Sequence, residues 1–491
     1  MIATTVLAYL GVGLFGLPPW VSLTLCPLAG VVAGLACSDW RIAGLGGGLG
    51  VLLGTYAGSF TLAEVSGRVL GPYSYWVPAA LAVVVAGGVA SLLDQMPHVC
   101  RYVEWVGVGL VVLSVILCGW ADASLPAGEN NLPSSFALYD AVPAITANIS
   151  DTDVYITAIR RMQRGEDYYH AMGHTYEAVD NARPAQAWNL QDPAQYKMPT
   201  LFWFLSALPS GGRGWVAAML VLASVATVAG WTIASRYVSP PIALVGATIL
   251  GAYLEGFGTA NLPQSELWSG LVLLIGLALA LKSLSVRERP MAWAVAAACA
   301  GLLAALLRDV AGAFMVVGLA STLVTEGWRS RRLWVPWVVA ALLFVLAYAA
   351  HISAAIAVGR TLPHVVTLST GGFLAQHFDP SGRGLLASVV EVSQWAQWST
   401  AMGWVIVVSG AVGAVLAPRD GSRRALVAGI GLGGVVALVF FHPAGKLWGG
   451  GLPPSYWGQL VMPSVIACAT LPLSRVAWTA RRRGRSLVAT S

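Results

Sequence analysis

The sequence predicts an all-α polytopic membrane protein with roughly 12 to 14 transmembrane helices and a large extracytoplasmic loop bearing short interfacial helices. Of its 491 residues, 57% are hydrophobic and only 10% are charged. A soluble domain has about 25% charged residues, so a water-soluble fold is excluded. Apolar stretches of about 18 to 22 residues recur along the chain, and each is long enough to cross a hydrocarbon core.

Hydropathy divides the chain into roughly fourteen apolar segments. In order, they are 2–17, 19–37, 42–63, 74–94, 102–121, 214–235, 239–255, 266–284, 290–308, 309–327, 333–353, 396–417, 425–441 and 457–474. The first lacks a basic region before it and is expected to be a retained helix rather than a signal peptide. We expect residues 1–100 to form a separate bundle of about four segments, 101–475 the main unit, and 476–491 a basic cytoplasmic tail.

The basic residues indicate the orientation. When the segments alternate in direction, the arginine clusters at 329–332, 419–424 and 481–485 all fall on one side, which the positive-inside bias makes cytoplasmic. Both termini are then inside, and the stretches at about 122–213 and 354–395 are outside, as is 442–456. The net charge of +6 is explained by these topology signals, so nucleic-acid binding is not expected. The six cysteines suggest neither a disulfide framework nor a metal site.

The large loop at 122–213 carries most of the candidate chemistry. Ser150 or Asp151 can cap a short helix that ends at Gly165, and the helix is expected to lie on the membrane surface. Its apolar face is formed by Tyr155, Ile159 and Met162. After Gly165 we expect a long irregular stretch, until the apolar residues after Lys197 return the chain to the membrane.

Asp151 and Asp153 lie in the first turn of that helix. Acids at this position stabilise the helix dipole. For either aspartate taken alone, this structural role has about the same weight as a catalytic role. Their spacing points the two carboxylates in different directions. A divalent ion bound by the pair is an alternative, but the sequence offers no third ligand beside them.

Several motifs resemble the membrane-embedded glycosyltransferases of the GT-C superfold, in particular the bacterial branch that uses polyprenyl-phosphate sugars. Residues 151–155 (Asp-Thr-Asp-Val-Tyr), Ala158 and residues 165–168 (Gly-Glu-Asp-Tyr) are similar to that family's acidic loop motif. Pro199 and the Gly-Leu-rich run 301–308, which ends in an arginine, also resemble family features. The resemblance covers about residues 102–474. The chain departs from the family in having about four extra segments before the acidic loop, and the carboxyl-terminal soluble domain of some members is not expected here.

The resemblance implies inverting transfer of a sugar, with mannose or arabinose expected, from a polyprenyl-phosphate donor to an envelope glycan or glycolipid acceptor. Such a reaction needs a carboxylate base, and the motif assigns this role to Asp151 with Asp153 as partner. Cations must hold the departing phosphate. The candidates are Arg308, His364, His377, Arg383, His442 and Lys446. Tyr155 and Lys197 are expected to bind substrate, and a divalent cation is not required.

Structural alternatives stand beside these roles. Arg308 and Asp309 can be a simple ion pair at a helix end, and each histidine can be a hydrogen-bonded cap. The glycine-rich run after His442 can approach a phosphate closely or can be only a flexible loop. The main rival functions are a lipid or sugar transporter or flippase and a non-catalytic membrane subunit. The oligomeric state is not indicated by the sequence.

Overall fold

The computed structural model of the chain describes a helical protein. It describes residues 135–141, 150–182, 196–209, 211–238, 262–285, 288–362, 382–395, 400–416, 421–440 and 455–473, with single residues and short pieces elsewhere between 105 and 254 and at 418. Every regular element in these ranges is a helix. The predicted bundle at 1–100 and the predicted tail at 476–491 lie outside the described residues.

Five of the described helical stretches are long and apolar enough to cross a membrane. They are α10 (Gly212–Ala234), α12 (Ser265–Ser283), α13 (Pro290–Leu307), the 3-10 turn η4 (Asp309–Gly312) with α14 (Ala313–Glu326), and α15 (Arg331–Gly359). Each begins and ends within a few residues of a segment expected from hydropathy, except that α15 continues about two turns further. The multi-pass helical class is therefore confirmed for this part of the chain.

The carboxyl-terminal helices pack beside these spans. They are α17 (Arg383–Trp395), α18 (Thr400–Leu416), α19 (Gly421–Phe440), the 3-10 turn η5 (Ser455–Leu460) and α20 (Met462–Cys468). The segment predicted at 457–474 is not one continuous helix, because the 3-10 turn η5 and the seven-residue α20 divide it. Pro463 lies in the first turn of α20, where its missing N–H is tolerated, but a helix continuing from η5 would lose a hydrogen bond there.

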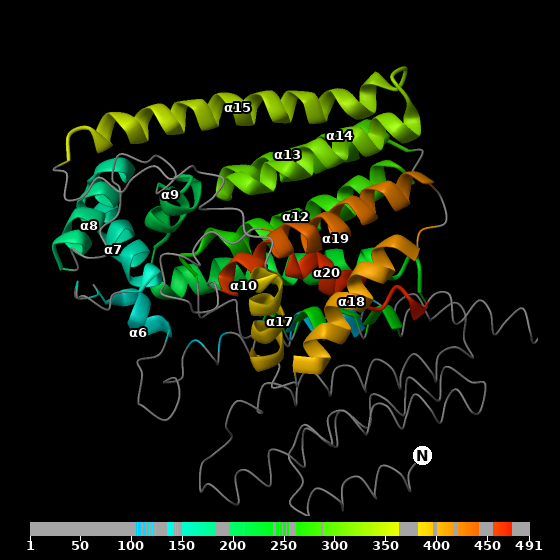
Figure 1. The fold of residues 1–491 in the computed structure, drawn as a ribbon, viewed down its shortest axis with the longest axis horizontal. Coiled ribbons are helices and arrows are strands. Elements are labelled where there is room, and N and C mark those ends of the chain that lie inside the picture. Colours follow the sequence, from blue (N-terminus) through cyan, green and yellow to red (C-terminus); the bar gives the residue numbers. More distant parts are fainter. Residues whose placement is uncertain are drawn as a thin grey trace, which may run out of the picture.

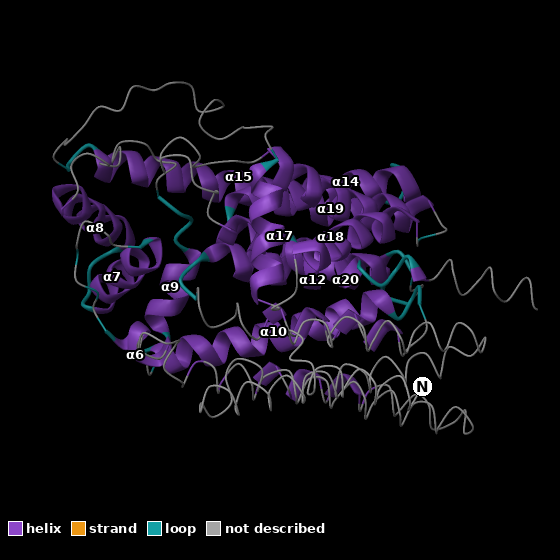
Figure 2. Cartoon of the chain, turned by 60° about the horizontal axis from the view of Figure 1, so that its bottom comes forward, coloured by secondary structure: helices purple, strands orange, loops and turns teal. Residues whose placement is uncertain are grey.

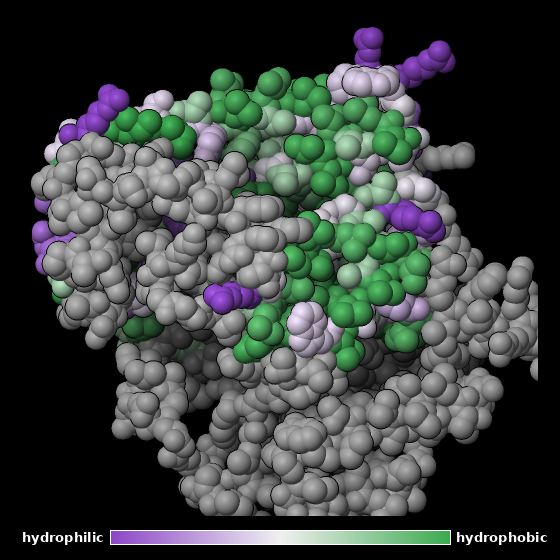
Figure 3. Space-filling model, viewed as in Figure 1, coloured by the Kyte–Doolittle hydropathy of each residue, from purple (hydrophilic) through white to green (hydrophobic). Residues whose placement is uncertain are grey.

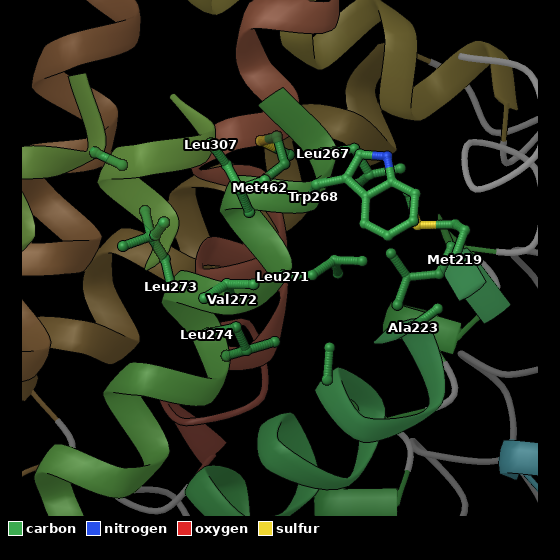
Figure 4. Packing of buried hydrophobic residues seen from close by; sticks show 14 of the residues in the cluster. Met219, Ala223, Leu267, Trp268, Leu271, Val272, Leu273, Leu274, Leu307 and Met462 are labelled. Atoms are coloured by element: carbon green, nitrogen blue, oxygen red, sulfur yellow. The ribbon is translucent and has the colours of Figure 1, made fainter. Parts of the chain in front are cut away.

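The core is centred on α12, which is apolar on all sides. Figure 4 shows Leu267, Leu271 and Leu274 of α12 pointing among Met219 of α10 and Met462 of α20. All five side chains are buried. A helix that is hydrophobic all round lies either in a protein core or in lipid, and the buried side chains of α12 place it in the core.

The long helix α15 lies at the edge of the molecule with much of its apolar surface exposed (Figure 1). Its exposed side chains include Leu342, Val345 and Leu346. Figure 3 shows hydrophobic residues along this helix and hydrophilic residues at its two ends. An exposed apolar surface of this length fits contact with lipid chains.

Four shorter helices from the predicted large loop form a group at one end of the spans (Figures 1 and 2). These loop helices are α6 (Ser135–Asp140), α7 (Asp151–Gln163), α8 (Tyr168–Ala182) and α9 (Thr200–Ala207). The backbone N–H of Gly212, at the start of α10, donates to Oδ1 of Asp140 at 2.9 Å. A carboxylate on α6 therefore caps α10 and fixes the loop helices to it.

The expected irregular stretch after Gly165 is wrong, because α8 is a regular helix of 15 residues. Oδ1 of Asp167 accepts from the N–H groups of Tyr169 at 3.0 Å and His170 at 3.3 Å, which caps the start of the helix. The buried face of α8 follows the helical spacing and includes Ala171, Met172, Thr175, Tyr176 and Val179. These cap and spacing signals were present in the sequence.

Candidate functional site

The start of α7 is fixed by a capping box between Ser150 and Asp153. The N–H of Asp153 donates to Oγ of Ser150 at 3.2 Å, and the N–H of Ser150 donates to Oδ2 of Asp153 at 3.2 Å. The Ser150 hydroxyl also donates to that carboxylate at 2.7 Å. Ser150 is thus the N-cap, and the Asp153 carboxylate is engaged in the structure of the helix end.

The end of α7 is fixed equally firmly. Gly165 has φ of +97°, a conformation that favours glycine. Its N–H donates to the carbonyl of Met162 at 2.9 Å, and the N–H of Glu166 donates to the carbonyl of Arg161 at 3.3 Å. This pair of bonds is a Schellman motif. The boundaries of the helix that carries the two aspartates are therefore set by local sequence, as expected.

Loss of the N-terminal cap should destabilise the protein measurably. We expect Ser150→Ala to lower the free energy of unfolding by about 1 kcal/mol, because the backbone N–H of Asp153 at the start of α7 loses its acceptor. Thermal unfolding of the purified protein in detergent measures this change. Ser150→Thr, which keeps the hydroxyl, is the control, and equal stability of the two variants would contradict the capping role.

A charged cluster lies where α12 and α13 meet the loop helices. It consists of Lys197, Glu266, Arg308 and Asp309. Glu266, in the first turn of α12, is only 1% exposed, and its Oε1 lies 3.1 Å from Nε of Arg308 and 3.7 Å from Nζ of Lys197. Nη1 of Arg308 also lies 3.3 Å from Oδ1 of Asp309. Glu266 thus holds two cations side by side in a largely buried setting, where charges persist only when paired.

Asp151 lies within electrostatic reach of this cluster. Burial and the nearby Arg308 lower the pKa of Lys197, while the carboxylates of Glu266, Asp151 and Asp309 partly oppose that shift. Burial and then the Asp151 carboxylate raise the pKa of Tyr176 far above its ordinary value. The starts of α7 and α12 are joined directly, since Nε2 of Gln264 donates to Oγ1 of Thr152 at 3.3 Å. The start of α7, which carries Asp151, therefore lies against the start of α12, whose Glu266 pairs with Lys197 and Arg308.

The backbone at Lys197 is held from two sides. The hydroxyl of Tyr168, on α8, donates to the Lys197 carbonyl. Nε2 of His351, on α15, lies 3.1 Å from the carbonyl oxygen of Tyr196. Nδ1 of the same ring lies 3.1 Å from the hydroxyl of Tyr169. Burial also raises the pKa of Tyr196 to about 12, so that phenol stays protonated at neutral pH.

Other predicted site residues lie elsewhere. Tyr155 is buried, and its ring packs nearly perpendicular to that of Phe202 with centroids 5.5 Å apart, so it belongs to the core beneath α7. Arg383 lies exposed at the start of α17, which is separated from α7 in both views (Figures 1 and 2). The remaining candidates lie outside the described residues: His364, His377, His442 and Lys446.

Sequence reasoning missed two residues of this site, Glu266 and His351, and placed a third, Tyr168, only in the loop motif. The available signal for Glu266 was an acid at the first position of the apolar segment 266–284, because an ionisable residue at the edge of a membrane span is a functional candidate by default. His351 lies inside the segment 333–353 and had the same signal. Tyr168 gave none beyond its place in the loop motif.

Lys197 and Arg308 are the groups of the cluster that could contact an anion, and Glu266 and Asp309 balance their charge. Within the described ranges, no three histidine, cysteine, aspartate or glutamate side chains are grouped so that they could hold a metal. Asp153, which the sequence offered as a metal ligand with Asp151, is hydrogen-bonded to Ser150 instead. The site combines two adjacent cations with a half-buried carboxylate, which can bind a phosphate and accept a proton close to it.

Comparison with known proteins does not place the chain in a family. No protein-family model, curated protein or solved structure matches it. The argument for function therefore depends on the chemistry of Asp151 and the charged cluster.

Proposed function

We propose that the protein is a membrane glycosyltransferase of the GT-C type. It transfers a sugar, mannose or arabinose by resemblance, from a polyprenyl-phosphate donor to an envelope glycan or glycolipid outside the plasma membrane. The observation that carries the proposal is the pair of cations, Lys197 and Arg308, that a buried Glu266 holds at the start of a spanning helix, with the Asp151 carboxylate within electrostatic reach of Lys197. A base and a phosphate-binding pair are the two groups that this reaction needs.

In the proposed reaction, an acceptor hydroxyl attacks the anomeric carbon of the donor sugar. Asp151 takes the hydroxyl proton as the new C–O bond forms. The bond from the anomeric carbon to the phosphate oxygen breaks, and its electron pair leaves on the polyprenyl phosphate. Lys197 and Arg308 stabilise the charge that develops there. Glu266 keeps both cations oriented before the donor arrives, so little reorganisation is needed during the reaction.

The orientation follows from charge. We place the loop helices on the extracytoplasmic side, because exposed Arg329, Arg331 and Arg332 lie at the turn between α14 and α15, the opposite end of the spans. A lipid-linked donor can then lie with its chain along the apolar helices while its phosphate reaches the charged cluster. This arrangement fits a multi-pass plasma-membrane enzyme whose acceptor lies outside the cell.

A transporter or flippase is the main alternative, and the described spans favour catalysis over it. Transport pathways need ionisable residues near mid-membrane. In the five candidate spans, Asp, Glu, Lys and Arg residues occur only in the first and last turns. His351 is the one internal histidine of these spans, and it is bonded to Tyr169 and to the carbonyl of Tyr196.

Purified protein reconstituted in sealed vesicles distinguishes the two functions. The probes are polyprenyl-phosphate mannose and polyprenyl-phosphate arabinose with a labelled sugar, supplied together with an envelope glycan extract. A glycosyltransferase releases polyprenyl phosphate and labels the glycan in equal amounts. Movement of intact donor across the bilayer without either product would instead support the flippase and overturn the proposal.

The pH dependence of transfer should depend on Lys197. Below its lowered pKa the side chain is an ammonium that binds the donor phosphate, and above that pKa it is a neutral amine. Activity should therefore fall on the alkaline side, by about tenfold per pH unit once the proton is lost. Lys197→Arg keeps the charge and should extend activity to higher pH. Lys282→Arg is the control, and an unchanged alkaline limb in Lys197→Arg would contradict this role.

A further inference from the structure

A chain of hydrogen bonds joins the spanning helix α15 to the backbone beside Lys197. His351 is only 4% exposed and uses both ring nitrogens. The Tyr196 carbonyl can only accept a hydrogen bond, so Nε2 must carry the proton and donate. In a neutral ring Nδ1 is then an acceptor, and it receives the hydroxyl proton of Tyr169. The two bonds fix both the tautomer and the orientation of the ring.

The surroundings leave the segment of Tyr196 and Lys197 little room to move. Gly173 of α8 faces the end of α15, and a Cβ placed there would lie 2.6 Å from Cδ1 of Leu362 and 3.3 Å from Oη of Tyr196. The Tyr196 ring also packs on that of Tyr176, with centroids 6.2 Å apart. Figure 1 shows the end of α15 passing beside α8. Close packing on one side and a hydrogen bond on the other hold this backbone in one position.

We propose that His351 is a positioning residue, which holds the backbone at Tyr196 so that the ammonium of Lys197 stays on Glu266. Lys197 is mostly buried, and its Nζ lies 3.7 Å from Oε1 of Glu266, a separation that a small backbone shift would lengthen. Without the His351 bond, the Tyr196 carbonyl would be buried without this donor, and the segment would move toward water. That Lys197 is held in place to bind a donor phosphate rests on the proposed function. That His351 holds Lys197 in place does not.

The lysine content of the chain allows a direct test, because the sequence has three lysines: Lys197, Lys282 and Lys446. An amine-acetylating reagent is applied to the full-length protein in detergent, and the modification of each lysine is followed by peptide mass spectrometry. Lys282, whose Nζ lies 3.7 Å from the Trp293 ring centroid, is the internal reference. In the wild-type protein, the buried and paired Lys197 should react more slowly than Lys282.

His351→Ala should raise the ratio of Lys197 to Lys282 modification about tenfold, because loss of one buried hydrogen bond favours local opening by about that factor. His351→Gln can keep a donor toward the Tyr196 carbonyl and should stay within about twofold of wild type. Ser353→Ala, on the exposed side of α15, is the matched control and should leave the ratio unchanged. A ratio in folded His351→Ala that equals wild type overturns the inference, as does an equal rise in Ser353→Ala.

If His351→Ala does not yield folded protein, His351→Asn and His351→Gln decide the question. Both replacements are polar, but the shorter asparagine does not reach the Tyr196 carbonyl. Only His351→Asn should therefore raise the ratio of Lys197 to Lys282 modification. Equal ratios in the two variants overturn the inference. Sugar transfer is measured on the same variants, and loss of position should raise the donor KM more than it lowers kcat. If the modification ratio rises in the His351 variants but the wild-type protein transfers no sugar, only the proposed function is refuted. Transfer with an unchanged ratio refutes the positioning role alone.

Discussion

Asp151→Asn should nearly abolish sugar transfer while the protein remains folded. Asparagine has the shape of aspartate but cannot take the proton of an acceptor hydroxyl, so we expect kcat to fall by about 10² to 10⁴. Folding should change little, because the helix start is held by Ser150 and Asp153 and the charge in the first turn contributes about 0.3 to 1 kcal/mol. Steady-state transfer from a polyprenyl-phosphate sugar measures the change, with size-exclusion chromatography as the check on folding.

Asp153→Asn is the matched control, since the two aspartates are two residues apart on the same helix. Its carboxylate is bonded to Ser150, so this variant should lose stability but keep most of its transfer activity. Two results would contradict the assignment of the base to Asp151. One is full activity in folded Asp151→Asn, and the other is an equal loss of kcat in both variants.

Local and compositional features of the fold were predictable from the sequence. The spans α10, α12, α13 and α14 follow from runs of apolar residues, because a bilayer requires such runs. The ends of α7 follow from Ser150 and Gly165, because caps act within a few residues. The division of segment 457–474 into η5 and α20 was not predictable from hydropathy alone. The residues of α20 are buried among other helices, and hydropathy does not distinguish a short buried helix from a span.

The site was predictable only in part. Asp151 was a candidate because it matches the acidic loop motif, and Lys197 and Arg308 were candidates because cations outside the predicted cytoplasmic ends are few. Their partnership with Glu266 depends on how α12 and α13 pack, and no local pattern encodes that. The same holds for His351, whose partners Tyr169 and Tyr196 are more than 150 residues away in sequence. Contacts of this range arise from tertiary structure, so a single sequence does not reveal them.

Glu266→Gln should cause the largest loss of stability among these changes. The substitution keeps the shape of the side chain but removes the carboxylate charge that lies 3.1 Å from Arg308 and 3.7 Å from Lys197, at a position only 1% exposed. Breaking a buried ion pair from one side costs about 3 to 5 kcal/mol, because the remaining charge stays desolvated. Thermal unfolding in detergent measures the loss. Glu326→Gln, at the exposed end of α14, is the control and should change stability by about 0.5 kcal/mol or less.

A double variant separates the structural role of this pair from its role in transfer. Glu266→Leu combined with Arg308→Met replaces two buried charges by apolar side chains of similar volume, an exchange that often restores or exceeds the original stability. We expect the double variant to be more stable than Glu266→Gln and to transfer no sugar, because the phosphate then has lost its guanidinium. Wild-type stability in Glu266→Gln would show that the Glu266 charge is not needed to stabilise the buried charges of Arg308 and Lys197. Transfer by the double variant would remove Arg308 from the phosphate site and leave Lys197 as its only proposed cation in the described part of the chain.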